Sequence, residues 1–179
     1  MTRNQGSRAL GIAVGLAALI GPGPATATPP LEVKGLQIGM TEEQVVATLG
    51  SMRPRGLTIG GVPSFYADNW RLPLDPGVQI SIADGKLVRF TFLFKARHFE
   101  AMQLAFQDKY SALRCADSAV TTKAGARLPL TECELQDSLS RLSIRQYVGD
   151  IDTSALVLES KEHSAREAAA QREGRRKDI

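Results

Sequence analysis

The stretch IGMTEEQVVATLG, residues 38–50, carries the strongest local structural signal in the chain. Thr41 is a favourable N-cap, and Gln44 three residues later completes a capping-box pattern, in which each side chain bonds the other residue's backbone N–H. Gly50 suits the left-handed position that often ends a helix. The stretch therefore predicts a short helix of about two turns. The side chains expected to face inward are Val45, Val46 and Leu49.

Downstream of this helix, alternation of apolar and polar residues predicts strands. A segment punctuated by Gly and Pro over residues 51–63 precedes a predicted strand at residues 64–72. Asp84-Gly85 is a dipeptide typical of two-residue hairpin turns. The strand before this turn places Val78, Ile80 and Ile82 on one face, and the return strand does so with Val88, Phe90, Phe92 and Phe94. These apolar rows are interpreted as core.

A second helix is expected over about residues 98–113, where one apolar stripe recurs at helical spacing. The stripe consists of Phe99, Met102, Phe106, Tyr110 and Leu113. After Cys115 comes a loop rich in small residues. Period-two patterns then predict further strands around Cys133 and Leu135, Leu142 and Ile144, and Leu156 and Leu158.

The order helix–strands, helix–strands predicts an α+β fold with short helices packed on antiparallel sheet. We expect two such units in tandem, with halves of about 34–96 and 97–160 inside one domain at residues 28–160. Residues 161–179 are expected to form a charged C-terminal helical tail. Its basic run Arg175-Arg176-Lys177 is either solvated or a contact for an acidic partner.

Residues 1–27 are interpreted as a secretory signal peptide. Arg3 and Arg8 precede an apolar run from Ala9 to Ile20, and small residues at 25–27 suit cleavage between Ala27 and Thr28. The alternative is a membrane anchor, but that run is shorter than the roughly 20 residues that cross a bilayer. We therefore expect a periplasmic or secreted protein with no transmembrane span in its mature chain.

The composition of the mature chain argues against two classes of partner. Cleavage removes two of the 22 Lys and Arg residues and leaves 20 against 19 acidic ones. A nearly neutral surface gives no electrostatic reason to expect nucleic acid or an anionic membrane as partner.

The sequence contains two cysteines, Cys115 and Cys133. An even pair in an exported protein favours a disulfide. The alternative is a redox or metal-binding pair. Against it, the spacing is far from C-x-x-C, and neither His98 nor His163 is close in sequence.

The segment KGLQIGMTEEQVVATLG, residues 34–50, resembles the SmpA/OmlA (BamE-like) small envelope proteins. The shared features are G-M-T, a short helix with Gln-Val, then Leu-Gly and strands. The resemblance implies a short helical segment on an antiparallel sheet and an address in the cell envelope. The β-lactamase inhibitor protein uses two such units in tandem, and the repeat here is similar. Family members are typically lipoproteins, but Thr28 stands where their lipid-bearing Cys would follow the signal, so no lipid anchor is expected.

The sequence gives little support for catalysis. It contains no G-x-S-x-G, H-E-x-x-H or P-loop pattern, and no residue set that predicts a cofactor or metal site. Glu132 and Glu134 flank Cys133, but that alternation is the ordinary solvent face of a strand. The protein is therefore predicted to be no enzyme.

The segment SFYADNWRLP, residues 64–73, concentrates residue types common at interaction hot spots. Tyr66, Trp70 and Arg71 are the candidate partner-binding residues, although Phe65 and Trp70 are also suited to capping the sheet core. The predicted function is an exported, non-enzymatic protein-binding or scaffold module of the bacterial cell envelope, with another envelope or secreted protein as partner. The alternative is a secreted inhibitor of an extracytoplasmic enzyme, with the tandem sheet as its concave face.

Overall fold

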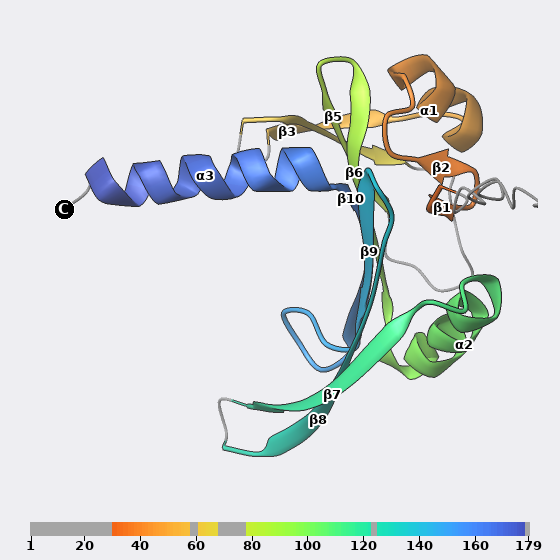
Figure 1. Ribbon diagram of the computed structural model, residues 1–179, viewed down its shortest axis with the longest axis vertical. Coiled ribbons are helices and arrows are strands. Elements are labelled where there is room, and N and C mark those ends of the chain that lie inside the picture. The colour runs from red at the N-terminus through yellow and green to blue at the C-terminus, as the bar shows by residue number, and fades with distance from the viewer. Residues whose placement is uncertain (1–29, 58–60, 68–77, 123–124, 178–179) are drawn as a thin grey trace, which may run out of the picture.

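A computed structural model of the protein describes residues 30–57, 61–67, 78–122 and 125–177. Within these residues an eight-stranded antiparallel sheet has the strand order β3-β4-β5-β6-β10-β9-β8-β7, beside a small two-stranded hairpin, β1-β2 (Figure 1). The strands are Glu32–Val33 (β1), Leu36–Gln37 (β2), Arg53–Leu57 (β3), Pro63–Ala67 (β4), Val78–Ala83 (β5), Lys86–Lys95 (β6), Arg114–Thr121 (β7), Arg127–Gln136 (β8), Ser140–Arg145 (β9) and Thr153–Ser160 (β10). The α-helices are Glu42–Leu49 (α1), Phe99–Lys109 (α2) and Lys161–Lys177 (α3), and a 3₁₀ turn at Ala96–His98 precedes α2.

One face of the large sheet carries the hydrophobic core. Its side chains lie in register from strand to strand, so that apolar rows cross β5, β6, β10, β9 and β8. One row is Val78, Phe92, Leu156, Ile144 and Cys133, and all five are almost completely buried. Figure 1 shows α1, α2 and the β1-β2 hairpin on this side of the sheet. These elements cover the core face and exclude water from it.

The helix predicted from residues 38–50 is confirmed. The Thr41 hydroxyl accepts the backbone N–H of Gln44, and the Gln44 side chain accepts that of Thr41 at 2.9 Å, so the capping box is complete. Val45 and Leu49 are buried in the core, whereas Val46 is only partly buried.

The predicted hairpin is also confirmed, with one change in its inward residues. Asp84 and Gly85 both have positive φ, as a tight β5-β6 turn of this kind requires. Phe90, Phe92 and Phe94 are buried as expected, but Leu87 is buried in place of Val88. The pairing of β5 with β6 shifts register between Ser81 and Ile82. An extra residue in one strand changes which side chains of the hairpin face the core.

The predicted fold class is wrong. The expectation was of two helix–strand units with short helices packed on their own strands, but about half of the described residues are in strands and one continuous sheet dominates. β6 pairs with β10 along seven residues, which joins the strands of the two predicted halves. α2 lies over the junction of β6 and β10. Its Phe106 lines a cavity of about 260 Å³ together with Phe92 of β6 and Leu156 of β10.

Two strands of the large sheet were missed, as were the two short strands β1 and β2, and this explains part of the error. β3 and β7, the two edge strands, lie where we expected irregular segments, and every residue of both is exposed. A strand with no buried face shows no apolar alternation. The second helix is shorter than predicted: it ends at Lys109, and Tyr110 is already extended. The charged C-terminal helix is present as α3.

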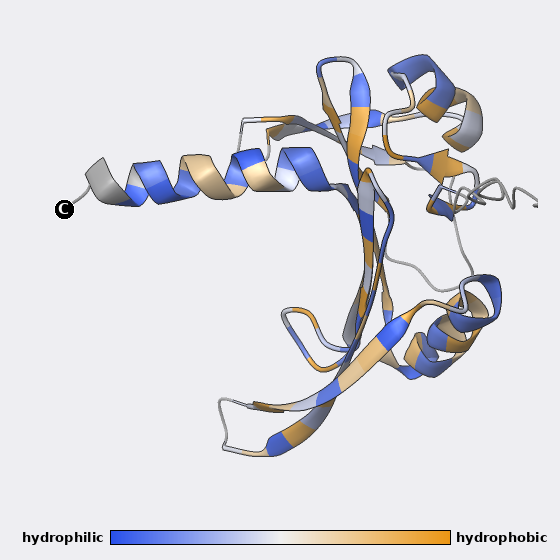
Figure 2. Cartoon of the chain, viewed as in Figure 1, coloured by the Kyte–Doolittle hydropathy of each residue, from blue (hydrophilic) through white to orange (hydrophobic). Residues whose placement is uncertain are grey.

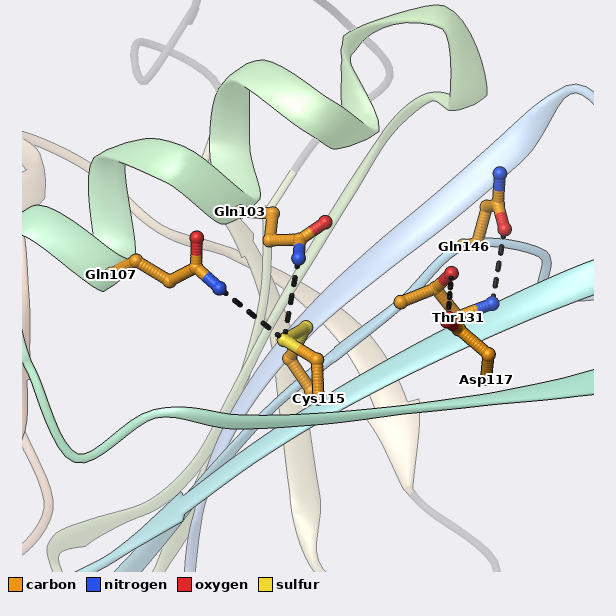
Figure 3. The surroundings of a disulfide bond; sticks show 7 residues. Gln103, Gln107, Cys115, Asp117, Thr131 and Gln146 are labelled. Carbon is orange, nitrogen blue, oxygen red and sulfur yellow. Dashed lines mark hydrogen bonds between the residues drawn. A yellow bond between two sulfur atoms is a disulfide. The ribbon is translucent and has the colours of Figure 1, made fainter.

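The predicted disulfide is confirmed. Cys115 on β7 and Cys133 on β8 are direct cross-strand neighbours and are bonded to each other. Figure 3 shows Gln103 and Gln107 reaching from α2 toward the Cys115 sulfur, at 3.4 and 3.9 Å. The disulfide thus lies between the outer strands and α2.

Candidate protein-binding face

The second face of the large sheet is concave. Figure 1 shows both ends of the sheet, β3 and the β7-β8 pair, bending toward the side from which α3 projects. Side chains of a strand alternate between faces, so the residues between those of the core point to this side. One register row across it is Tyr66, Gln79, Thr91, Val157, Ser143 and Glu134, and a second is Leu93, Ala155, Arg145 and Glu132. We call these two rows the concave face.

The composition of the concave face is mixed. Arg145 on β9 and Glu132 on β8 are opposite each other, and their side chains form an ion pair at 2.6 Å while both stay about half exposed. Thr91 and Val157 in the middle of the face are partly buried. A surface of this kind holds its polar groups in place on paired strands, which limits the side-chain entropy lost when a partner binds.

Next to the concave face, four charged side chains form a cluster at the base of α3. Glu159 of β10 is buried and accepts from Arg89 of β6 at 2.9 Å and from Arg141 of β9 at 2.9 Å. Arg89 also donates to Glu167 of α3 at 2.9 Å. Burial alone would raise the pKa of Glu159, but the hydrogen bonds from the arginines outweigh burial and hold that pKa below its ordinary value.

This cluster fixes the direction of α3. The helix follows β10 without a break, and Arg89 ties its second turn to the sheet through Glu167. His163 lies 3.4 Å from the same Glu167 carboxylate. From there α3 extends away from the sheet, and its hydropathy is mostly polar in Figure 2. A polar groove of about 440 Å³ separates it from β3, β4 and β5, lined by Arg55, Ser64, Gln79, Arg89, Glu167 and Gln171. The helix α3 therefore borders the concave face on one side.

Exposed apolar side chains lie around the same face. Tyr66 of β4 is 38% exposed, and Leu57 at the end of β3 is 71% exposed beside the groove. Ile151 is 54% exposed in the loop between β9 and β10, which Figure 1 shows on the concave side. Aromatic and large apolar side chains that stay in water in the free protein are suited to contact a partner.

Of the three candidate partner-binding residues, the structure places one. Tyr66 lies on the concave face, and the Arg55 guanidinium stacks over its ring at 4.9 Å. Trp70 and Arg71 lie outside the described residues, as do Ala27 and Thr28 of the expected cleavage site. Sequence reasoning missed Arg55 and Gln79, which bond each other at 2.6 Å. Arg55 stands in the stretch we expected to be irregular, so nothing in the sequence linked it to Tyr66.

The described residues contain no group of three or more His, Cys, Asp or Glu side chains that could hold a metal ion. His98 accepts from its neighbour Arg97 at 3.1 Å, and His163 lies beside Glu167. Both cysteines are in the disulfide. Within the part of the chain that the structure describes, no helix is long and apolar enough to cross a membrane.

Comparison of the chain with protein-family models, with curated proteins and with solved structures finds no match.

Proposed function

We propose that this protein is an exported, non-enzymatic binding module of the bacterial cell envelope, related to the SmpA/OmlA-like proteins, and that it binds another envelope or secreted protein through its concave face. The observation that carries the proposal is the asymmetry of the sheet. Among the described residues, one face is covered by α1, α2 and the β1-β2 hairpin, while the other has α3 along its border only.

The chemistry of the concave face supports a protein partner. Its cross-strand ion pair, Arg145 with Glu132, brings opposite charges together, so the face has no strong single sign of charge. Tyr66, Leu57 and Ile151 supply exposed apolar groups around this polar surface. Polar surface with a few large apolar anchors is the usual composition of protein–protein interfaces. A concave surface is suited to a convex partner.

The alternative proposal, a secreted inhibitor of an extracytoplasmic enzyme, would use the same face. Both proposals place the protein outside the cytoplasm, which the signal-peptide pattern at residues 1–27 and the disulfide favour. They differ in the partner: a component of the envelope in one case, and a soluble enzyme that loses activity when bound in the other.

A pull-down with matched variants tests the proposal. The exported protein is immobilised and exposed to envelope and periplasmic extracts, and recovered proteins are identified by mass spectrometry. Tyr66→Ala combined with Ile151→Ser removes two apolar groups from the concave side. Leu104→Ser is the control, because Leu104 is 60% exposed on α2, which covers the opposite side of the sheet.

We expect the wild type and the Leu104 variant to retrieve the same partner, and the double variant to bind it at least about tenfold more weakly, as loss of hot-spot contacts does. Equal binding by all three proteins would contradict the role of the concave face. Recovery of one soluble enzyme whose activity falls on binding would select the inhibitor alternative.

A further inference from the structure

The outermost strand of the large sheet, β7, has no neighbour on its far side in the described structure. It pairs with β8 along eight residues, Arg114 to Thr121, and all eight side chains are exposed. A strand at a sheet edge presents unpaired backbone N–H and C=O groups, which are a template for another strand. β7 is therefore exposed at its edge and on both of its faces.

The opposite edge of the sheet is protected, and β7 is not. β3 contains Pro54, which has no N–H to donate, and its pairing with β4 is irregular between Pro54 and Gly56. It also carries Arg53 and Arg55. Proline, bulges and positive charges are the usual devices against edge pairing. β7, with the sequence RCADSAVT, has no proline and no bulge, and its two charges cancel.

Two hydrogen bonds show which backbone groups of β7 point outward, away from β8. Thr122 N–H donates to the Ala126 carbonyl at 2.8 Å, so this even-numbered pair at the end of the hairpin is hydrogen-bonded. Gln146 N–H donates to the Thr131 carbonyl at 3.1 Å, so odd-numbered residues of β8 face β9 and not β7. Hydrogen-bonded and non-hydrogen-bonded pairs alternate along an antiparallel ladder.

It follows that the even-numbered residues of β7 bond β8 and the odd-numbered ones face outward. The Cα atoms of Cys115 and Cys133 are only 3.9 Å apart, which agrees with a non-hydrogen-bonded pair. The backbone of Asp117 faces outward, and its contact with β8 is made by its side chain. Figure 3 shows this contact, in which the Asp117 carboxylate accepts from the Thr131 hydroxyl of β8 at 2.7 Å. The residues with outward backbone groups are Cys115, Asp117, Ala119 and Thr121.

From this geometry we infer that β7 is a dimerisation edge, and that it pairs with β7 of a second copy of this chain to continue the sheet through both subunits. A two-fold axis at Ser118 places Cys115 opposite Thr121 and Asp117 opposite Ala119 of the other copy. Every outward N–H on one strand then faces a C=O on the other. In the same register Ser118 meets Ser118 of the second copy.

Other two-fold registers fit less well. An axis at Asp117 brings two carboxylates face to face, and like charges directly opposite each other destabilise a strand pair. An axis at Ala119 leaves the Cys115 backbone groups beyond the end of the strand. The register with its axis at Ser118 pairs all four residues whose backbone groups face outward. It also places Ser118 opposite Ser118 and Asp117 opposite the small Ala119, which favours a second copy over an unrelated strand. The inference concerns the sheet edge, and it does not depend on the partner proposed for the concave face.

Oligomeric state and directed cross-linking test this dimer. Sedimentation velocity over a concentration series should show a dimer for the wild type. Ala119→Pro removes an outward N–H and leaves the ladder to β8 intact, so it should raise the dimer dissociation constant at least about 100-fold. Circular dichroism and an intact Cys115–Cys133 bond should confirm that this variant is folded.

Ser118→Cys should form a disulfide-linked dimer under mild oxidation, because non-hydrogen-bonded cross-strand pairs have Cα atoms close enough to be bridged. Leu57→Cys at the end of the protected edge is the control, and should cross-link much more slowly. A wild type that stays monomeric up to about 100 µM overturns the inference. So does a dimer that Ala119→Pro leaves unchanged, or one that Leu57→Cys cross-links as fast as Ser118→Cys.

Discussion

Arg89 and Glu159 are cross-strand neighbours on β6 and β10, and Arg89 Nη2 lies 2.9 Å from Glu159 Oε2. The pairing of β6 with β10 joins the group of strands β3 to β6 to the group of strands β7 to β10. Arg89 also bonds Glu167 of α3 at 2.9 Å. A single arginine therefore links the joint of the sheet to the projecting helix, and removal of its carboxylate partner should affect both.

The first prediction is that Glu159→Gln lowers the free energy of unfolding by about 2–4 kcal/mol at neutral pH, because it breaks a charge pair around a buried carboxylate while Arg89 and Arg141 stay charged. The arginines are partly exposed, which keeps the loss below that of a fully buried pair. Urea denaturation measures this loss. Glu162→Gln is the control, since Glu162 lies on the exposed side of α3 and its removal should cost little.

The same variant has a predictable pH dependence. The pKa of folded Glu159 lies below its ordinary value of 4.5. Its stabilisation is therefore fully present above that value and is lost as the pH falls through the lower pKa of the folded state. The difference in stability between wild type and Glu159→Gln should shrink on acidification below about pH 4.5. A difference that stays constant, or grows, between pH 7 and pH 3 would contradict this assignment.

The second prediction concerns α1. Leu49 is 3% exposed and belongs to the core cluster, so Leu49→Ala should lower the free energy of unfolding by about 2–5 kcal/mol through lost contacts and a cavity. Val46, one turn away, is partly exposed, and Val46→Ala should cost clearly less. Thermal or urea unfolding of the two variants compares them directly. Equal losses would mean that α1 packs through a different face.

Local signals predicted the elements whose structure depends on neighbours in sequence. Thr41 and Gln44 define the start of α1 within four residues, and Asp84-Gly85 requires only the backbone freedom of one turn. The buried strands were found for a related reason, because residues such as Phe90 and Phe92 alternate with others that are less buried. In each case the residues that carry the information are adjacent in the chain.

The arrangement of the sheet and the charged cluster could not be predicted in this way. The β6-β10 joint pairs Arg89 with Glu159, 70 residues later, and no local pattern relates them. The edge strands β3 and β7 were missed because both are exposed on both faces. Neither strand needs apolar residues at every second position, so their sequences lack the alternation that predicts a strand. Tyr66 was a candidate for its residue type, but its neighbours Arg55 and Gln79 come from strands that only the fold brings together.

The third prediction is that the chain is cleaved on export. Protein recovered from a periplasmic or culture fraction should have the intact mass of a chain that begins at Thr28, without added lipid, since no cysteine precedes Cys115. Mass spectrometry of the whole protein measures this. Retention of residues 1–27, or a mass that includes acyl chains, would contradict the proposed export route.

The last prediction concerns the disulfide, which joins Cys115 to Cys133, 18 positions later in the chain. Replacing both cysteines with Ala should lower the free energy of unfolding by about 3 kcal/mol, because the cross-link restricts the unfolded chain. The fold should survive, since most core side chains of the large sheet belong to β5, β6, β9 and β10, and Cys133 is the one buried core residue that β8 contributes among the described residues.

Hydrogen exchange locates the effect of this double variant. Among the described residues of one subunit, β7 is bonded to β8 alone and is exposed along its length, so the amides that it directs at β8 should exchange faster once the cross-link is gone, while those of β6 should change little. Mass spectrometry of the wild type without reductant supplies the control, and should show one bridged peptide pair and no alkylated thiol. Two freely alkylated cysteines in the exported protein would contradict the bridge, and equal acceleration in β6 and β7 would show that the disulfide supports the whole sheet rather than its outer edge.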